Sequence, residues 1–184
     1  MAASQTMDLD LGWKAADFDL LGADGHRYTL EKIRGPRGTL VIFMCNHCPY
    51  VKAALDMIIA DVRGLTAMGI GTVAIMPNDV EAYPGDSLEN MAKLAEDMHL
   101  PFPYVIDETQ AAAKAYGAVC TPEFYGFNAD LELKYHGRIA EFSHLQPVAN
   151  AKHEMFDALA MIAATGEGPA DQKPCMGCSI KWRE

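Results

Sequence analysis

Short apolar runs alternate along this chain with longer segments in which apolar side chains recur at helical spacing. Residues 39–44 and 72–76 form mostly apolar, partly β-branched runs, which is typical of strands buried on both faces of a parallel sheet. Between these runs, apolar residues fall on one face of a predicted helix: Val51, Leu55, Ile58, Ile59, Val62 and Leu65. The pattern predicts a strand, a helix and a second strand in the first half of the chain.

The same alternation continues beyond residue 76. Asp86 and Glu89 have the spacing of a capping box, and the helix that follows them would bury Leu88, Met91, Leu94 and Met98. We further expect a strand at 102–106, an Ala-rich helix at 109–116, a hairpin of strands at 124–127 and 131–135, and a last helix at about 147–164.

An Asp-Gly turn precedes the first buried strand. Residues 18–20 and 27–30 flank Ala23-Asp24-Gly25, and Asp-Gly is a favoured sequence for the tight turn of a β-hairpin. Residues 30–33 then predict a short helical turn. Together these elements predict an α/β fold with a central mixed sheet, helices on both faces and an N-terminal β-hairpin.

The chain has the length of one domain, because 184 residues can bury a substantial core. Gly166-Glu167-Gly168-Pro169 has the composition of a linker. We therefore expect a domain over residues 1–165 and a C-terminal tail over residues 166–184.

Charge and composition narrow the classes of function. The chain carries 25 acidic and 15 basic residues, a net charge of −10, and no basic run that would follow a phosphate backbone. No apolar stretch approaches the roughly 18 residues that span a bilayer, and residues 1–13 lack the basic and apolar regions of a signal peptide. We expect a soluble, cytoplasmic protein that binds neither nucleic acid nor membrane.

Cys45 and Cys48 form a Cys-x-x-Cys pair where the first buried strand gives way to a helix. The first turn of a helix presents unpaired N–H groups and the positive end of the helix dipole, so a thiolate is favoured there. His47, between the two cysteines, would stabilise a neighbouring thiolate further in its charged form. In a reducing compartment this placement indicates a redox dithiol rather than a structural disulfide.

Three further cysteines lie outside this pair. Cys120 precedes a Thr-Pro dipeptide, and Cys175 and Cys178 form a second Cys-x-x-Cys pair in the tail. We regard all three as secondary redox candidates. The tail dithiol would shuttle electrons to or from the first pair, lie docked and inert, or bind a metal.

The residues also resemble a known superfamily. A Cys-x-x-Cys pair at a strand-to-helix junction, followed by Thr121-Pro122 before a β-hairpin and a last helix, resembles the thioredoxin fold. The resemblance implies that Pro122 is cis, that Thr121 offers its backbone to an extended substrate, and that both residues face Cys45. The long segment between Cys48 and Pro122 and the N-terminal hairpin resemble the alkyl hydroperoxide reductase/thiol-specific antioxidant, or peroxiredoxin-like, branch.

Two short motifs make the resemblance narrower. FMCNHCPYVKA at 43–53 and GCSIKW at 177–182 are similar to a bacterial subgroup of thioredoxin-like, redoxin-domain proteins. The resemblance implies thiol–disulfide or antioxidant chemistry that uses these cysteines.

Some positions depart from the patterns of both branches. With Cys48 in the peroxidatic position, Cys45 stands where a peroxiredoxin has Thr or Ser, and Val41 where it has Pro. Thr39 replaces the buried acid of thioredoxins, which leaves Glu123 and His47 as candidate bases. Arg138 would be the cation of a peroxide site or an exposed arginine at a strand end.

The sequence therefore predicts a thiol–disulfide oxidoreductase in which Cys45 attacks a substrate disulfide and Cys48 resolves the mixed disulfide. A thiol peroxidase is the alternative within the same family, and a zinc- or copper-binding module is an alternative from another class. Neither Cys-x-x-Cys is followed by His and no nucleotide motif is present, so we expect no cofactor. The expected partners are protein or small-molecule disulfides and thiols, and peroxides in the alternative, with the chain a monomer or a homodimer.

Overall fold

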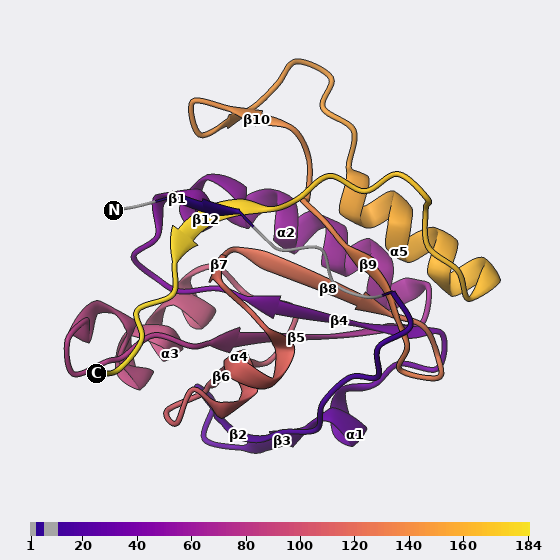
Figure 1. The fold of residues 1–184 in the computed structure, drawn as a ribbon. Coiled ribbons are helices and arrows are strands. Elements are labelled where there is room, and N and C mark those ends of the chain that lie inside the picture. Colours follow the sequence, from indigo (N-terminus) through magenta and orange to yellow (C-terminus); the bar gives the residue numbers. More distant parts are fainter. Residues whose placement is uncertain (1–2, 6–10) are drawn as a thin grey trace.

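A seven-stranded mixed sheet forms the centre of the computed structural model, which describes residues 3–5 and 11–184 (Figure 1). Its strands lie in the order β3-β2-β6-β5-β4-β8-β9. β4, β5 and β6 are parallel, and the strands toward both edges are antiparallel to their neighbours. The bounds are β2 (Asp19–Gly22), β3 (Arg27–Thr29), β4 (Gly38–Phe43), β5 (Ile70–Met76), β6 (Tyr104–Ile106), β8 (Glu123–Phe127) and β9 (Leu133–His136).

Helices cover both faces of this sheet, as the apolar runs require. Alternate side chains of a strand point to opposite faces, and in β4 Leu40 and Ile42 join one core while Val41 and Phe43 join the other. The first core includes residues of α2 (Pro49–Ala67), α3 (Leu88–Asp97) and α5 (Glu154–Thr165). The second includes residues of α1 (Leu30–Ile33) and α4 (Ala111–Tyr116). Because both faces of β4 are buried, the strand can hold the residues that follow it rigidly.

A smaller sheet lies at the end of β4 where the cysteines are. It joins β12 (Met176–Ser179) to β1 (Ala3–Gln5) on one side and to β7 (Cys120–Thr121) on the other. In Figure 1 the yellow C-terminal segment runs back from α5 beside β1 and passes the start of α2. The tail is therefore laid across the domain in this structure and pairs with it through backbone hydrogen bonds.

Most of the predicted elements are confirmed, with shifts of one to a few residues at their ends. These include the N-terminal hairpin, the helical turn α1, the strands β4, β5 and β6, the helices α2 and α4, and the hairpin of β8 and β9. The predicted inner face of α2 is buried throughout. Gly117 ends α4 with a φ of 66°, a left-handed conformation that glycine adopts without cost.

The start of α3 and the last helix differ from the prediction. Ser87, not Asp86, caps α3 by accepting a hydrogen bond from the Asn90 N–H, while Asp86 ends a 3-10 turn, η1 (Pro84–Asp86), and is buried. The last helix, α5, begins at Glu154 rather than near 147. Residues 142–147 instead form a small hairpin of β10 (Phe142–Ser143) and β11 (Gln146–Pro147).

Within residues 3–5 and 11–184, no helix is both long enough and apolar enough to cross a membrane. The expected absence of a signal peptide concerns the N-terminal segment, which lies largely outside the described residues.

Candidate redox site

The first Cys-x-x-Cys pair bridges the carboxyl end of β4 and the start of α2. Cys45 follows the end of β4 by two residues, and Cys48 is the N-cap of α2 with Pro49 in the first helical position. Proline is favoured there because the missing N–H has no acceptor in the helix. β4 therefore delivers the pair to the N-terminus of a 19-residue helix.

Both sulfurs of this pair are buried. The exposed fraction is 1% for Cys45 and 0% for Cys48, so neither thiol is open to solvent in this structure. The Cys45 Sγ lies 3.5 Å from the Thr121 hydroxyl. The Cys48 Sγ lies 3.2 Å from the Thr121 carbonyl oxygen and 2.7 Å from the Cys178 Sγ. Cys48 thus contacts both the segment before Pro122 and the tail.

The pKa values of the two thiols are shifted in opposite directions. The pKa of Cys48 is lowered to about 5, mainly because the Cys45 thiol donates a hydrogen bond to its sulfur, with a further contribution from Cys178. The Val51 N–H in the first turn of α2 also lowers this pKa, although it lacks the geometry of a full capping bond. The same interaction with Cys48 raises the pKa of Cys45, and burial and the Asp86 charge act in the same direction. In the resting dithiol the negative charge therefore lies on Cys48, at the positive end of the helix dipole.

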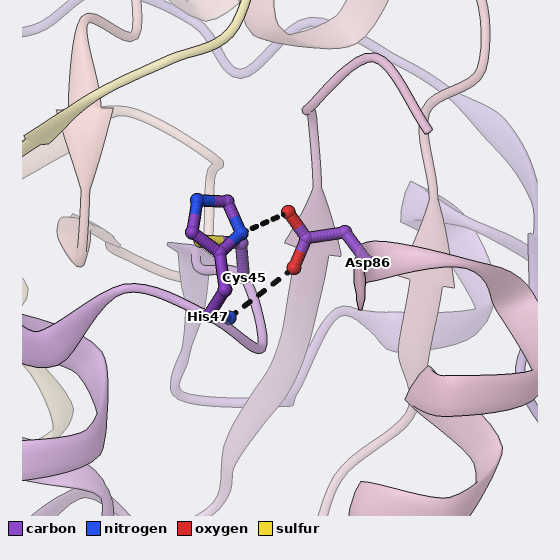
Figure 2. Close-up of side chains that lie close together, drawn as sticks. All are labelled: Cys45, His47 and Asp86. Atoms are coloured by element: carbon purple, nitrogen blue, oxygen red, sulfur yellow. Dashed lines mark hydrogen bonds and ion pairs between the residues drawn. The ribbon is translucent and has the colours of Figure 1, made fainter. Parts of the chain in front are cut away.

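Asp86 holds the loop between the two cysteines. Its buried carboxylate accepts hydrogen bonds from the Asn46 N–H at 2.8 Å, the His47 N–H at 3.3 Å and the Asn78 side-chain amide at 2.9 Å. Figure 2 shows this carboxylate reaching both the ring and the backbone of His47, with the ring Nδ1 at 2.6 Å. The His47 ring stacks on Tyr83 at a centroid distance of 5.5 Å. The loop is therefore fixed by one anion rather than by its own backbone.

Sequence reasoning placed Asp86 in a helix cap and so missed this role. The signal was its position: the segment after β5 lies at the carboxyl end of a parallel strand, the edge at which sites of α/β sheets assemble. Asn78, in the loop after β5, reaches the site at this edge by donating a hydrogen bond to Asp86.

Thr121 lies against the cysteine pair, and the proline that follows it is cis, as the resemblance implies. The Thr121–Pro122 peptide bond is cis, and both the hydroxyl and the carbonyl of Thr121 face the cysteine pair. Beside Pro122 a cavity of about 480 Å³ is lined by residues that include Tyr50, Phe124 and Cys175. The cavity reaches the Thr121–Pro122 segment through Pro122, while neither Cys45 nor Cys48 lines it.

Other candidates from the sequence lie in separate interactions. Glu123 is buried and accepts hydrogen bonds from the backbone of Val119 and Cys120, from the Tyr125 hydroxyl and from His136. These four hydrogen bonds stabilise the segment before Pro122, and none of them involves Cys45 or Cys48. The structure therefore favours a structural role for Glu123 over that of a base.

Arg138 and Thr39 are also placed away from the dithiol. Arg138 forms an ion pair with Glu154 at 2.8 Å and lines the cavity beside Pro122, whereas neither Cys45 nor Cys48 lines that cavity. Thr39 lies at the opposite end of β4, buried, and its hydroxyl has no partner among the described residues. Neither side chain can act directly on the sulfurs in this arrangement.

The three remaining thiols are buried as well. Burial raises the pKa of Cys120, and the charge of Glu123 adds to this effect. Burial likewise raises the pKa of Cys175, whose thiol donates to the Gly137 carbonyl at 2.9 Å. Cys178 contacts the first pair directly, with its Sγ 2.7 Å from the Cys48 Sγ.

A metal site was the alternative from another class. Among the described residues, the potential ligands that converge are Cys45, His47 and Asp86, with ligand atoms within 4.8 Å of one another. Both Asp86 oxygens already accept hydrogen bonds that hold the loop, and His47 Nδ1 is bound to one of them. A metal would have to displace these bonds, so the donor set fits a thiol site better than a metal centre.

Comparison with known proteins shows which family the chain belongs to. A family model described as AhpC/TSA family matches residues 11–141, which is more than half of the chain. The chain belongs to the AhpC/TSA family. As a member of this family it has the thioredoxin-like fold in its peroxiredoxin-like variant, with the N-terminal hairpin β2–β3 added to the central sheet.

Solved structures of two similar proteins match nearly the whole chain. An uncharacterized conserved protein from Geobacillus kaustophilus is 39% identical, covers 100% of this chain and 97% of its own, and has a TM-score of 0.94. A hypothetical protein from Sinorhizobium meliloti is 31% identical, covers 97% of this chain and 98% of its own, and has a TM-score of 0.91. Peroxidoxin BcpB from Mycobacterium tuberculosis, at 16% identity over 86% of this chain and 96% of its own, has a TM-score of 0.60 and shares the fold. No functionally curated protein sequence matches the chain.

Proposed function

We propose that this AhpC/TSA-family protein is a thiol–disulfide oxidoreductase whose redox dithiol is Cys45 and Cys48. The observation that carries the proposal is the placement of Cys48 at the N-cap of α2, with its Sγ 3.2 Å from the Thr121 carbonyl oxygen and its pKa lowered mainly by the hydrogen bond from Cys45. A thiolate is the nucleophile in disulfide exchange, so a site that holds one at neutral pH is prepared for that reaction.

The exchange proceeds in two steps. The Cys45 thiol passes its proton to Cys48 along the hydrogen bond between them, and its thiolate attacks one sulfur of the substrate disulfide. The substrate S–S bond breaks, and the departing sulfur takes up the proton now held by Cys48, which restores the Cys48 thiolate. Cys48 then attacks the Cys45 sulfur of the mixed disulfide, which releases the second substrate thiol and leaves a Cys45–Cys48 disulfide. The reverse sequence delivers a disulfide to a substrate dithiol.

Geometry supports these roles for the two cysteines. Cys45 lies beside the Thr121 side chain, with its Sγ 3.5 Å from the hydroxyl. Cys48 lies under the Thr121 carbonyl and the tail. Both sulfurs are buried, and the tail contacts Cys48, so we assign the attack on the substrate to Cys45 and the resolving step to Cys48.

A second candidate function is a thiol peroxidase with Cys48 as the peroxidatic residue. The low pKa of Cys48 and the AhpC/TSA match support it. In this reaction the Cys48 thiolate attacks a peroxide oxygen, the O–O bond breaks, and Cys48 becomes a sulfenic acid as water or an alcohol leaves. Cys45 then attacks the Cys48 sulfur, which forms the same disulfide and releases water. The missing hydroxyl at position 45 removes one donor that such a site uses.

One experiment tests both functions. The fully reduced protein is mixed with oxidised glutathione or with hydrogen peroxide, the rate of thiol loss is measured in each case, and the cysteines are mapped by mass spectrometry. We expect rapid reaction with the disulfide, reaction with peroxide no faster than that of an ordinary thiol, and a Cys45–Cys48 disulfide as the product. Much faster reaction with peroxide would instead support the peroxidase. Slow reaction with both reagents would contradict both.

A further inference from the structure

The sulfur of Cys48 has a second thiol neighbour that the proposed function does not use. Cys178, in β12, lies with its Sγ 2.7 Å from the Cys48 Sγ. Its exposed fraction is 2%, so the contact is shielded from solvent. Two thiols held at this distance need only a small adjustment to reach the roughly 2.0 Å of a disulfide bond.

The backbone around Cys178 keeps it in this position. In β12, Cys178 pairs with Thr121 and Ser179 pairs with Cys120 in an antiparallel ladder. The carbonyl oxygen of Thr121 in turn lies 3.2 Å from Cys48. Cys178 of the tail and Cys48 of the dithiol therefore both contact Thr121, at the N-terminus of α2.

Gly177 makes this close approach of the tail possible. A Cβ at this position would lie 2.1 Å from the Thr121 carbonyl oxygen, which is a backbone atom that cannot move aside as a flexible side chain would. With glycine here, β12 packs directly on Thr121 and Pro122. The contact of Cys178 with Cys48 thus depends on the local sequence of the tail as well as on strand pairing.

The N-terminus of α2 faces both sulfurs. The Tyr50 N–H interacts with Cys178 and the Val51 N–H with Cys48. Both donors are in the first helical turn, where N–H groups lack partners within the helix. Negative charge on either sulfur during exchange is therefore stabilised by the same helix end.

From this geometry we infer that Cys178 is a third redox thiol, which forms a second disulfide with Cys48. The inference rests on the proposed Cys45–Cys48 exchange. Starting from the Cys45–Cys48 disulfide, the sulfur of Cys178 attacks the sulfur of Cys48. A Cys48–Cys178 bond forms, the Cys45–Cys48 bond breaks, and the electron pair and the proton lost by Cys178 pass to Cys45. No external oxidant is needed, because one disulfide replaces another.

The consequence is that the oxidised protein has two forms. In one, Cys45 is occupied in the disulfide; in the other, Cys45 is a free thiol beside Thr121 and able to attack again. The tail then stores the disulfide while the substrate-facing thiol is regenerated.

The decisive test uses the variant Cys45→Ser, in which the Cys45–Cys48 disulfide cannot form. The reduced variant is incubated with oxidised glutathione, quenched in acid, alkylated and mapped by mass spectrometry. Cys48 should first form a mixed disulfide with glutathione, and Cys178 should then displace reduced glutathione to give a Cys48–Cys178 bond. A Cys48 that remains glutathionylated, or that stays free beside a free Cys178, would overturn the inference if the wild-type protein forms its Cys45–Cys48 disulfide under the same conditions.

Matched variants separate this chemistry from a loss of structure. Cys45→Ser/Cys178→Ser keeps a hydrogen-bond donor beside Cys48 and should remain glutathionylated at Cys48. Cys45→Ser/Cys120→Ala removes another fully buried thiol and should still form the Cys48–Cys178 bond. If the second control failed to form it while remaining folded, the assignment of Cys178 would be wrong.

The wild-type protein supplies a measurement that needs no variant. With limiting oxidised glutathione, mapping over time should find both Cys45–Cys48 and Cys48–Cys178 disulfides. Finding the first alone would overturn the inference and leave the proposed function intact. Finding no intramolecular disulfide at all would contradict the proposed function itself.

Discussion

Two Cys-x-x-Cys pairs with identical spacing have opposite electrostatic surroundings in this molecule. The first pair spans the junction between a buried strand and a long helix, and its second cysteine is the N-cap of α2. The second pair lies in extended chain, with Cys178 inside β12 and Cys175 just before it. A helix N-terminus concentrates N–H donors and partial positive charge, whereas a strand has almost no net dipole.

The pKa values follow this difference. Thiol donors and the helix start lower the pKa of Cys48 to about 5. Burial is the largest cause of the raised pKa of Cys175 and of Cys178, which for Cys178 reaches about 12. The spacing of cysteines therefore does not by itself make a reactive pair. The secondary structure that carries them decides which sulfur holds a charge.

The largest difference between the pairs should appear when one thiol of each is removed. We expect Cys48→Ser to abolish turnover in a disulfide-reductase assay and to accumulate a mixed disulfide through Cys45, because the resolving thiol is gone. Cys175→Ser, in the tail pair, should retain most of the turnover. Equal losses of turnover in the two variants would remove the functional distinction between the pairs. If Cys45→Ser accumulated a mixed disulfide on Cys48 while Cys48→Ser formed none, the roles of Cys45 and Cys48 would be reversed.

A titration of the thiolate should also distinguish the two pairs. At neutral pH a thiol with a pKa of about 5 is almost fully ionised, whereas an ordinary cysteine is ionised to only a few per cent, a difference of roughly 30-fold. The ultraviolet thiolate absorbance of the reduced protein should therefore fall as the pH drops through about 5. Cys48→Ala should lose this transition, and Cys175→Ala should keep it.

The same shift links the stability of the reduced protein to pH. Because the folded state lowers the pKa of Cys48 below its value in the unfolded chain, this group stabilises the reduced protein fully above the unfolded value of about 8.5. The stabilisation decreases as the pH falls and is lost near pH 5. A free energy of unfolding that did not decrease from pH 8.5 to 5 relative to Cys48→Ala would contradict the shift.

The sequence predicted the elements and the first dithiol for clear physical reasons. Buried strands and an amphipathic helix leave strong periodic patterns, and Cys45 and Cys48 lie at the junction of two of them. The supports of the site were not predictable in the same way. Asp86 satisfied a local capping pattern, and only the tertiary structure shows that its carboxylate instead accepts four hydrogen bonds around His47.

The tail illustrates the same limit over a longer distance. Cys178 is 130 residues from Cys48 in sequence, and no local pattern specifies which strand an extended segment joins. The pairing of β12 with β7 depends on Gly177 and on a strand of two residues. A sequence can therefore indicate a second dithiol without indicating what it contacts.

Asp86 offers a test of how far the first pair depends on its loop. Asp86→Asn preserves the size of the side chain but replaces one carboxylate oxygen by an NH2 group. In the wild-type protein both oxygens accept hydrogen bonds from N–H donors, and the NH2 group cannot accept them. We expect the free energy of unfolding to fall by roughly 2–3 kcal/mol, because buried donors would lose their acceptor. Glu89→Gln is the matched control, since Glu89 is exposed, and it should change stability by less than about 0.5 kcal/mol. Similar effects of the two substitutions would mean that Asp86 does not hold the loop.

The smallest expected effect concerns the redox potential and His47. The imidazole lies 2.6 Å from the Asp86 carboxylate, whose charge also acts on Cys45. His47→Ala removes the partner of that negative charge, so the thiolate form of the reduced site becomes less stable. The disulfide is then harder to reduce, so the potential measured against glutathione should become more negative. A tenfold change in the equilibrium constant corresponds to roughly 30 mV. His26→Ala, in the exposed turn of the N-terminal hairpin, should leave the potential unchanged; an unchanged potential in His47→Ala as well would show that the Cys45–Cys48 pair gains its thiolate from the helix and its thiol neighbours alone.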